Sequence, residues 1–188
     1  MKVSRDQVAE HHSKVVDAAS RLFRERGFES VTLDDVMNEA GLTRGAFYGH
    51  FKSKDDLMAQ ACAHAVRPDA ENTAATLHDY SAEYLSAFHR DNRTGGCSFA
   101  ALGAEAARQS LSIRHGMTEG LKRKIAHMSA FAAGDTDETR RAAAISSLST
   151  MLGGLILSRL VDDPALSEEI LRTNRDALAA SHPAHGIS

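Results

Sequence analysis

The sequence contains no Trp, and aromatic residues make up only 5% of its 188 residues. It holds only 3 Pro, and no alternation of apolar and polar residues is long enough to indicate a strand. Aromatic and β-branched residues favour strands, whereas Ala and Leu favour helices. A chain that is rich in Ala and poor in aromatics is therefore expected to be all-α.

Long apolar runs and paired cysteines are also missing. The most apolar run, Met151 to Leu157, is too short to cross a membrane, and the N-terminal MKVSRDQVAEHH lacks the apolar core of a secretory signal. Cys62 and Cys97 lie far apart and form no CxxC motif. These absences indicate a cytoplasmic protein with reduced thiols and no membrane partner.

The sequence has no motif of catalysis or metal binding. Its 10 His are scattered, with no HExxH motif and no Cys/His cluster. A phosphate-binding loop and a GxSxG nucleophile motif are missing as well. We therefore expect no catalytic residue, no metal site and no cofactor, and we do not expect an enzyme.

The net charge of −3 provides no overall attraction to nucleic acid. A DNA-binding protein, however, needs only a local positive face where it meets phosphates. Basic residues gather at the N-terminal arm and between positions 44 and 54, namely Lys2, Arg5, Arg44, Lys52 and Lys54. Charge therefore neither indicates nor excludes a DNA partner.

The segment 31–57 contains three helix-start signals. Two are capping boxes, in which a hydroxyl and a carboxylate three residues later each accept a backbone N–H, and the third is a single N-cap candidate. These residues are Thr32 with Asp35, Ser53 with Asp56, and Thr43. With a glycine at position 41, where a helix usually stops, they predict short helices at 33–40 and 44–50 joined by a tight turn. This is the pattern of a helix-turn-helix, whose second helix lies in the DNA major groove.

A longer helix is expected before this segment, from about residue 6 to residue 26, ending at Gly27. One of its faces is apolar and carries Val8, Val15, Ala18, Ala19, Leu22 and Phe23. This face is expected to close a small three-helix core with the two short helices.

Residues 18–58 agree in type and order with one known pattern. The agreeing positions are Ala18, Phe23, Gly27, Phe28, Thr32, Ala40, Gly41, Phe47, Tyr48, His50, Phe51, Lys54 and Leu57. In this respect the chain resembles the N-terminal domain of the TetR family of bacterial transcriptional regulators. The resemblance implies a homodimer whose paired heads bind a palindromic operator in double-stranded DNA, and a helical body that binds a small-molecule inducer. The resemblance also implies that the regulator is a repressor.

The expected architecture is a three-helix head on a larger helical body, with about nine helices in all. Residues 1–52 form the helix-turn-helix domain and residues 53–67 a connecting helix, broken by the Arg67-Pro68-Asp69 sequence. Residues 68–180 form the ligand-binding and dimerisation domain, and residues 181–188 a disordered tail.

The candidate DNA contacts lie in and around the predicted second helix. Its first turn approaches base edges, and an arginine there can bond guanine O6 and N7, which contributes about 1–3 kcal/mol of discrimination. Polar tips and lysines nearby suit phosphate oxygens. The candidates are Thr32, Thr43, Arg44, Gly45, Ala46, Tyr48, His50, Lys52 and Lys54.

In the body, apolar stripes at helical spacing predict helices at 71–89, 112–133, 135–161 and from 163 onwards. The third of these begins with an Asp135-x-x-Glu138 cap. Several residues on these stripes, together with a cysteine, are candidates for the wall of an inducer pocket, namely Tyr84, Phe88, Cys97, Met117, Leu121, Met128 and Leu148.

The helix expected at 135–161 is apolar around more than half of its circumference, which is too wide a stripe for one core. We therefore expect the last two helices to form a four-helix bundle across a two-fold axis. The candidate dimer contacts are Leu148, Leu152, Leu155, Ile156, Ile170, Leu171 and Leu178.

Cys97 follows the Asp91–Gly96 loop and precedes a helical segment. Free amides at a helix N-terminus favour a thiolate. The pattern of Gly96, Cys97, Leu102 and Glu105 also resembles GC-x-x-x-x-L-x-x-E in a TetR subgroup that includes the repressor responding to N-ethylmaleimide, which implies a sensor thiol. The alternative, which we favour, is a small buried hydrophobe. A small-molecule binding protein with a vestigial head is a further alternative to the repressor.

Overall fold

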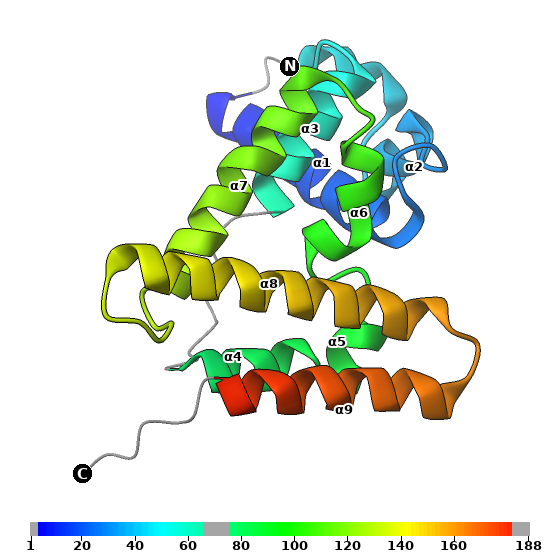
Figure 1. Cartoon of the computed structure of the whole chain (residues 1–188). Helices are drawn as coiled ribbons and strands as arrows, with labels where there is room; N and C mark the ends of the chain where they lie inside the picture. Colours follow the sequence, from blue (N-terminus) through cyan, green and yellow to red (C-terminus); the bar gives the residue numbers. More distant parts are fainter. Residues whose placement is uncertain (1–3, 66–75, 182–188) are drawn as a thin grey trace. The chain divides into compact units, whose positions relative to one another are not determined.

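The computed structural model describes residues 4–65 and 76–181. This part of the chain contains helices and no strands, which confirms the all-α prediction. The elements, shown in Figure 1, are α1 (Arg5–Arg26), α2 (Leu33–Glu39), the 3₁₀ helix η1 (Arg44–Gly49), α3 (Lys54–Ala65), α4 (Leu77–Tyr84), α5 (Ala87–Asp91), α6 (Ser98–Ala106), α7 (Leu111–Ser129), α8 (Asp137–Leu160) and α9 (Pro164–Ser181).

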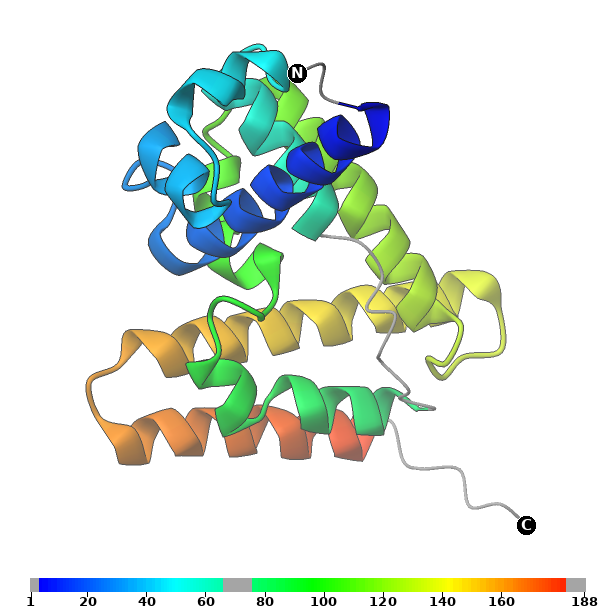
Figure 2. The ribbon, with the colours of Figure 1, turned by 180° about the vertical axis from the view of Figure 1, so that it is seen from behind.

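The first of two compact units comprises Met1–Arg67 and Cys97–Gly120. In it α1 packs against α2, α3 and α6, and Figure 2 shows α1 and α3 side by side. Residues 97–120, which are expected in the body, lie in this unit instead. They group with the head because Leu102, Ala106 and Ile113 are buried in the same apolar cluster as Phe23.

Helix α1 begins one residue before its expected start, at a capping box formed by Ser4 and Gln7. It ends at Gly27, whose φ of 79° favours glycine. Its buried face runs from Val15 to Phe23 as predicted. Val8, however, is 42% exposed, because it lies two turns before the part of the helix that meets the core.

The second unit comprises Pro68–Gly96 and Leu121–Ser188. Helices α8 and α9 lie side by side and run in opposite directions; α4 packs against both and α5 against α8 (Figure 1). Asp163 Oδ1 accepts hydrogen bonds from Ala165 N and Leu166 N, which confirms the expected start of α9. The boundary expected at residue 68 and the tail beyond Ser181 lie outside the described residues.

Three expected helix boundaries in the body differ from the structure. The helix expected at 71–89 is divided into α4 and α5, because the Ser86 hydroxyl accepts the N–H of His89 and starts a new helix; its expected start lies outside the described residues. Helix α8 is capped by Thr136 with Thr139 rather than by Asp135 and Glu138. Helix α7 ends at Ser129, four residues before its expected end.

Helix α8 is long and apolar enough, by length and composition alone, to cross a membrane, with an 18-residue window of mean hydropathy 1.3. This corrects the expectation that no segment reaches that length, because Ser, Thr and Gly between the aliphatic residues lower the hydropathy only a little. The core helix of a soluble protein meets the same criterion. Only 39% of this window is buried inside the chain, so α8 keeps a wide apolar surface.

Candidate nucleic-acid interface

Helix α2 is fixed at its start by the predicted capping box. The Thr32 hydroxyl accepts the N–H of Asp35 at 3.1 Å, and Asp35 Oδ2 accepts the N–H of Thr32 at 2.8 Å. Hydrogen bonds from the Thr32 hydroxyl and backbone lower the pKa of Asp35. After α2, the turn places Gly41 at a φ of 70°. The Thr32 side chain therefore serves the cap, and its expected DNA contact stays a prediction.

The second helix of the motif is the 3₁₀ helix η1, held by bonds such as Ala46 N–H to the Thr43 carbonyl at 3.0 Å. A 3₁₀ helix is tighter and shorter than an α-helix. The glycines at both ends of the segment disfavour a longer α-helix. Thr43 is the N-cap residue by backbone position, but its hydroxyl makes no capping bond, which corrects that part of the expectation. Its side chain is exposed, whereas Ala46 packs partly against the core.

Two glycines in η1 have no evident structural reason to be glycine. Gly45 and Gly49 have ordinary negative φ, and a Cβ at either position would meet nothing within 4 Å. Both residues are exposed. A glycine that costs helix stability without relieving strain inside the protein is consistent with close approach of an outside partner to the backbone.

Arg44 is exposed at the start of η1 and forms an ion pair with α2. Its Nη1 lies 2.7 Å from Asp34 Oδ2, and both side chains are at least half exposed. Exposed pairs of this kind contribute about 0–1 kcal/mol. The guanidinium is therefore oriented by α2 and remains exchangeable for a base or a phosphate.

Tyr48 projects from η1 with 72% of its surface exposed. Its ring meets the buried Phe47 edge to face, with the centroids 5.2 Å apart. The contact with Phe47 orients the ring, while the side chain stays largely exposed. The expected role of Tyr48 as a phosphate contact stays a prediction.

The two lysines after η1 differ in their surroundings. Lys52 is exposed, and its N–H is bound by Asp56 Oδ2 at 2.9 Å. Lys54 is half-buried, and its Nζ donates to the Phe28 carbonyl at 2.8 Å. The Lys54 ammonium therefore binds the protein's own backbone, a role that a sequence pattern alone does not reveal, and its contact with phosphate stays a prediction.

His50 is half-buried and lies close to two histidines of α1. Its ring centroid is 6.3 Å from those of both His11 and His12, and His12 stacks on Phe51 at 4.9 Å. Burial, and next the positive charge that His12 and His11 can carry, lower the pKa of His50. Sequence spacing does not predict this cluster, because His50 lies almost forty positions from His11 and His12.

The residues expected to line an inducer pocket are divided between the two units. Cys97 and Met117 belong to the first unit; Tyr84, Met128 and Leu148 are buried in the second. Phe88 and Leu121, which complete the expected set, are 78% and 36% exposed, so the structure does not support them as buried lining. Phe88 leaves the apolar stripe because α5 starts afresh at Ser86.

A surface pocket of about 390 Å³ lies in the second unit, and the sequence analysis missed it. Arg159 Nε donates to the Arg90 carbonyl at 2.9 Å and its Nη2 to the His89 carbonyl at 2.6 Å. These guanidinium bonds join the end of α5 to α8. The pocket is lined by Arg90, Asp91, Arg93, Ser158, Arg159, Val161, Asp162, Pro164 and Ser167.

Four of the expected dimer contacts are buried within the chain itself, because they form the core between α8, α9 and α4. They are Leu148, Leu155, Leu171 and Leu178, and they are not available to a partner. Ile156 is 44% exposed, and Leu152 and Ile170 are half-buried. The expectation missed further exposed apolar residues, namely Ile145, Leu157, Leu160 and Leu166. The wide apolar stripe of α8 was the signal that could have identified the first three, while Leu166 lies in α9.

Cys97 is the half-buried N-cap residue of α6, and its side chain makes no capping bond. Burial lowers the pKa of the Arg24 guanidinium, and a smaller charge interaction with Cys97 raises it. Cys62, in contrast, is buried, and burial raises its pKa to about 12. Of the two thiols, Cys97 has the surroundings that suit reactivity.

The comparisons with known proteins agree with this geometry. Residues 15–61 match the family described as bacterial regulatory proteins, tetR family. The HTH-type transcriptional regulator AcrR of Shigella flexneri is 39% identical over 57 residues, which are 30% of this chain and 26% of that protein. The uncharacterized HTH-type transcriptional regulator YerO of Bacillus subtilis is 37% identical over 57 residues, 30% of this chain and 20% of that protein. The matched segment thus spans about a quarter or less of these relatives.

Solved structures extend the likeness in fold to almost the whole chain. E. coli NemR in its reduced form has a TM-score of 0.71 at 18% identity, covering 94% of this chain and 99% of that one. A TetR transcriptional regulator from Legionella pneumophila has a TM-score of 0.70 at 17% identity, covering 97% and 100%. At such identities the likeness shows the fold alone, so the electrophile-responsive subgroup stays a prediction. Residues 15–61 therefore match the helix-turn-helix domain of the TetR family of bacterial regulatory proteins, and the fold of the chain is similar to that of a solved TetR regulator.

Proposed function

We propose that this protein is a transcriptional regulator whose η1 helix binds base edges in the major groove of an operator. The observation that carries the proposal is the exposed face of η1, where Arg44, Gly45 and Tyr48 lie together on one short helix. An arginine at the start of a recognition helix suits guanine, and Tyr48 suits a phosphate oxygen. The open space around Gly45 allows a DNA backbone to come close.

The functional form is a homodimer on a palindromic operator. The support is the apolar surface left on α8 and α9, including Ile156 and Leu160, which are 44% and 74% exposed. Two recognition helices of such a dimer would enter successive major grooves about 34–36 Å apart. Because the chain carries a net charge of −3, non-specific attraction to DNA is weak, and base contacts and dimer geometry supply most of the affinity.

The regulator acts as a cytoplasmic repressor that a small-molecule inducer releases from DNA. An inducer has this effect only if it binds the non-DNA state more tightly than the DNA-bound state. The buried residues Tyr84, Met128 and Leu148 offer the second unit an apolar environment for such a molecule.

The test is binding of the purified protein to a duplex that covers the region upstream of its own gene, measured by fluorescence anisotropy at low and at physiological salt. The expected result is a saturable complex that a scrambled duplex of equal length does not form at physiological salt. Absence of any preference for the upstream duplex, even at low salt, would contradict the proposal.

A second mode of release, by covalent modification of Cys97, is favoured by the half-buried position of this thiol at the start of α6, where free amides favour a thiolate. In that case Cys97→Ser would stay on the operator in the presence of N-ethylmaleimide, while the unchanged protein would leave it. Release of both proteins by the reagent would exclude this mode.

A further inference from the structure

The turn between α1 and α2, residues 27–31, is held by side chains from two distant helices. The N–H of Phe28 donates to Glu105 Oε2 of α6 at 2.8 Å. The carbonyl of the same residue accepts from Lys54 Nζ of α3 at 2.8 Å. The backbone N–H and C=O of Phe28 are therefore both satisfied by charged side chains, which lie 77 and 26 residues away in the sequence.

Phe28 has no freedom to turn these groups towards water. Its side chain is fully buried and meets Phe23 with the ring centroids 5.3 Å apart. A buried N–H that loses its partner keeps the full cost of desolvation, and bonds to a carboxylate are stronger than neutral ones. The position of Phe28 therefore depends on the Glu105 carboxylate.

Gly27 fits this arrangement in two ways. Its φ is 79°, which side chains rarely adopt, and a Cβ built there would lie 2.5 Å from Glu105 Oε1. The carboxylate thus packs directly over the turn, into space that only a glycine leaves. Glycine at 27 and glutamate at 105 are two separate features of the sequence that meet at one point of the structure.

The turn leads straight into the helix-turn-helix. Val31 is fully buried, and the next residue, Thr32, is the N-cap of α2. Helix α6, which carries Glu105, is anchored beside α1 by the buried side chains of Leu102 and Ala106. A carboxylate on a fixed helix therefore holds the point from which α2 begins.

We propose that Glu105 is a positioning residue for operator binding: by holding the N–H of Phe28 it sets where α2 starts, and so the orientation of η1 on DNA. The inference rests on the proposed function, since it gives α6 a part in DNA recognition without contact with DNA. It also accounts for the glutamate in the Gly96, Cys97, Leu102, Glu105 pattern.

Electrostatics alone makes the opposite prediction. Removal of a carboxylate makes the first unit less negative, which on charge alone tightens binding to any DNA. A loss of affinity for one sequence, without loss for others, therefore reports geometry and not charge.

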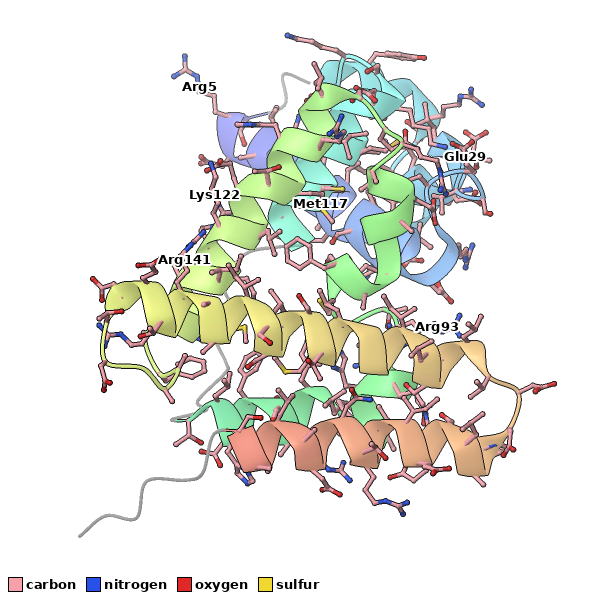
Figure 3. All side chains as sticks on the ribbon, in the orientation of Figure 1. Arg5, Glu29, Arg93, Met117, Lys122 and Arg141 are labelled. Atoms are coloured by element: carbon pink, nitrogen blue, oxygen red, sulfur yellow. The ribbon has the colours of Figure 1, made fainter. Side chains whose placement is uncertain are left out.

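The experiment compares Glu105→Ala, Glu105→Gln and Glu29→Ala in the full chain. Glu29 is an exposed carboxylate in the same turn and serves as the matched control (Figure 3). The probes are a duplex selected from a random library by the unchanged protein, and a scrambled duplex. We expect Glu105→Ala to lose about tenfold in affinity for the selected duplex and less than about twofold for the scrambled one. The glutamine, which still accepts the N–H, should recover most of the loss.

Hydrogen exchange of the backbone in residues 27–36 is measured on the same proteins without DNA. Faster exchange of this segment in Glu105→Ala, with Glu29→Ala unchanged, supports the positioning role even if no duplex is selected. Selection of no duplex by the unchanged protein contradicts the proposed function instead. Unchanged exchange in Glu105→Ala, or affinity for the selected duplex equal to that of the unchanged protein, would overturn the role of Glu105. If Glu105→Ala does not fold, both DNA affinity and hydrogen exchange are measured on Glu105→Gln, and a smaller change is expected in each.

Discussion

Arg44 and Asp34 form an ion pair between the two helices of the helix-turn-helix, with Nη1 and Oδ2 2.7 Å apart. The pair directs a cation along the exposed surface of η1, and it also places a carboxylate where DNA phosphates are expected. Since both side chains are at least half exposed, the pair contributes little to stability. If Arg44 contacts DNA as proposed, DNA competes with Asp34 for the guanidinium.

Substitution of Arg44 and substitution of Asp34 should therefore change the affinity for DNA in opposite directions. Arg44→Ala should weaken binding to the selected duplex by about tenfold or more, since a bidentate arginine contributes about 1–3 kcal/mol. Asp34→Asn should strengthen binding, because it frees the guanidinium and removes a negative charge. Anisotropy titrations at two salt concentrations measure both effects, and thermal unfolding should be nearly unchanged. Equal affinity of Arg44→Ala and the unchanged protein would remove Arg44 from the interface.

Gly45→Ala should separate stability from binding. A Cβ at this position meets nothing within 4 Å, so the variant should gain up to about 1 kcal/mol in unfolding free energy. The same methyl group should weaken DNA binding if the backbone of η1 approaches the duplex closely. Gly103→Ala in α6, where a Cβ also meets nothing, is the control and should gain stability without a change in affinity. Denaturant unfolding and anisotropy measure the two quantities, and unaltered affinity of Gly45→Ala would argue against close approach.

The stability of the first unit should depend on the protonation of His50. Its pKa is lowered in the folded protein, by burial and then by His12 and His11, so the unfolded chain binds the proton more readily. Folding stability should consequently fall as the pH drops below about 6.5, the ordinary pKa of histidine. His50→Gln should reduce this slope in denaturant titrations between about pH 5 and pH 7.5. The carboxylates with lowered pKa, such as Asp35 and Asp56, lose their contribution only at more acidic pH.

Substitutions of apolar residues in α8 should have different effects according to whether the residue is exposed or buried. Ile156→Glu together with Leu160→Glu changes two exposed side chains, so it should leave the fold intact and convert the dimer to a monomer. Leu155→Ala, at a fully buried neighbouring position, should instead cost about 2–5 kcal/mol of unfolding free energy. Light scattering after size-exclusion chromatography measures the first effect and denaturant unfolding the second. A double variant that remains dimeric would place the interface elsewhere.

Helices α1 and α2 could be predicted from the sequence, because their signals are local. The Thr32 capping box, the glycines at 27 and 41 and the period of the apolar residues in α1 act over a few residues, and the structure has them as predicted. Local signals also indicated which helix would carry the exposed face at Arg44. In the body, more than one local signal was present at some helix ends. Ser86 starts a new helix within one apolar stripe, and Thr136 caps α8 in place of the expected Asp135.

Which side chains are available to a partner depends instead on how the helices pack in the folded chain. The ammonium of Lys54 and the carboxylate of Glu105 bind the C=O and the N–H of one buried residue, Phe28, which no spacing in the sequence reveals. In the same way, Leu155 and Ile156 are neighbours of equal apolar character, yet one is buried and the other is 44% exposed. Helical periodicity shows that a stripe is apolar, but burial depends on where other helices pack, and that is a property of the folded chain.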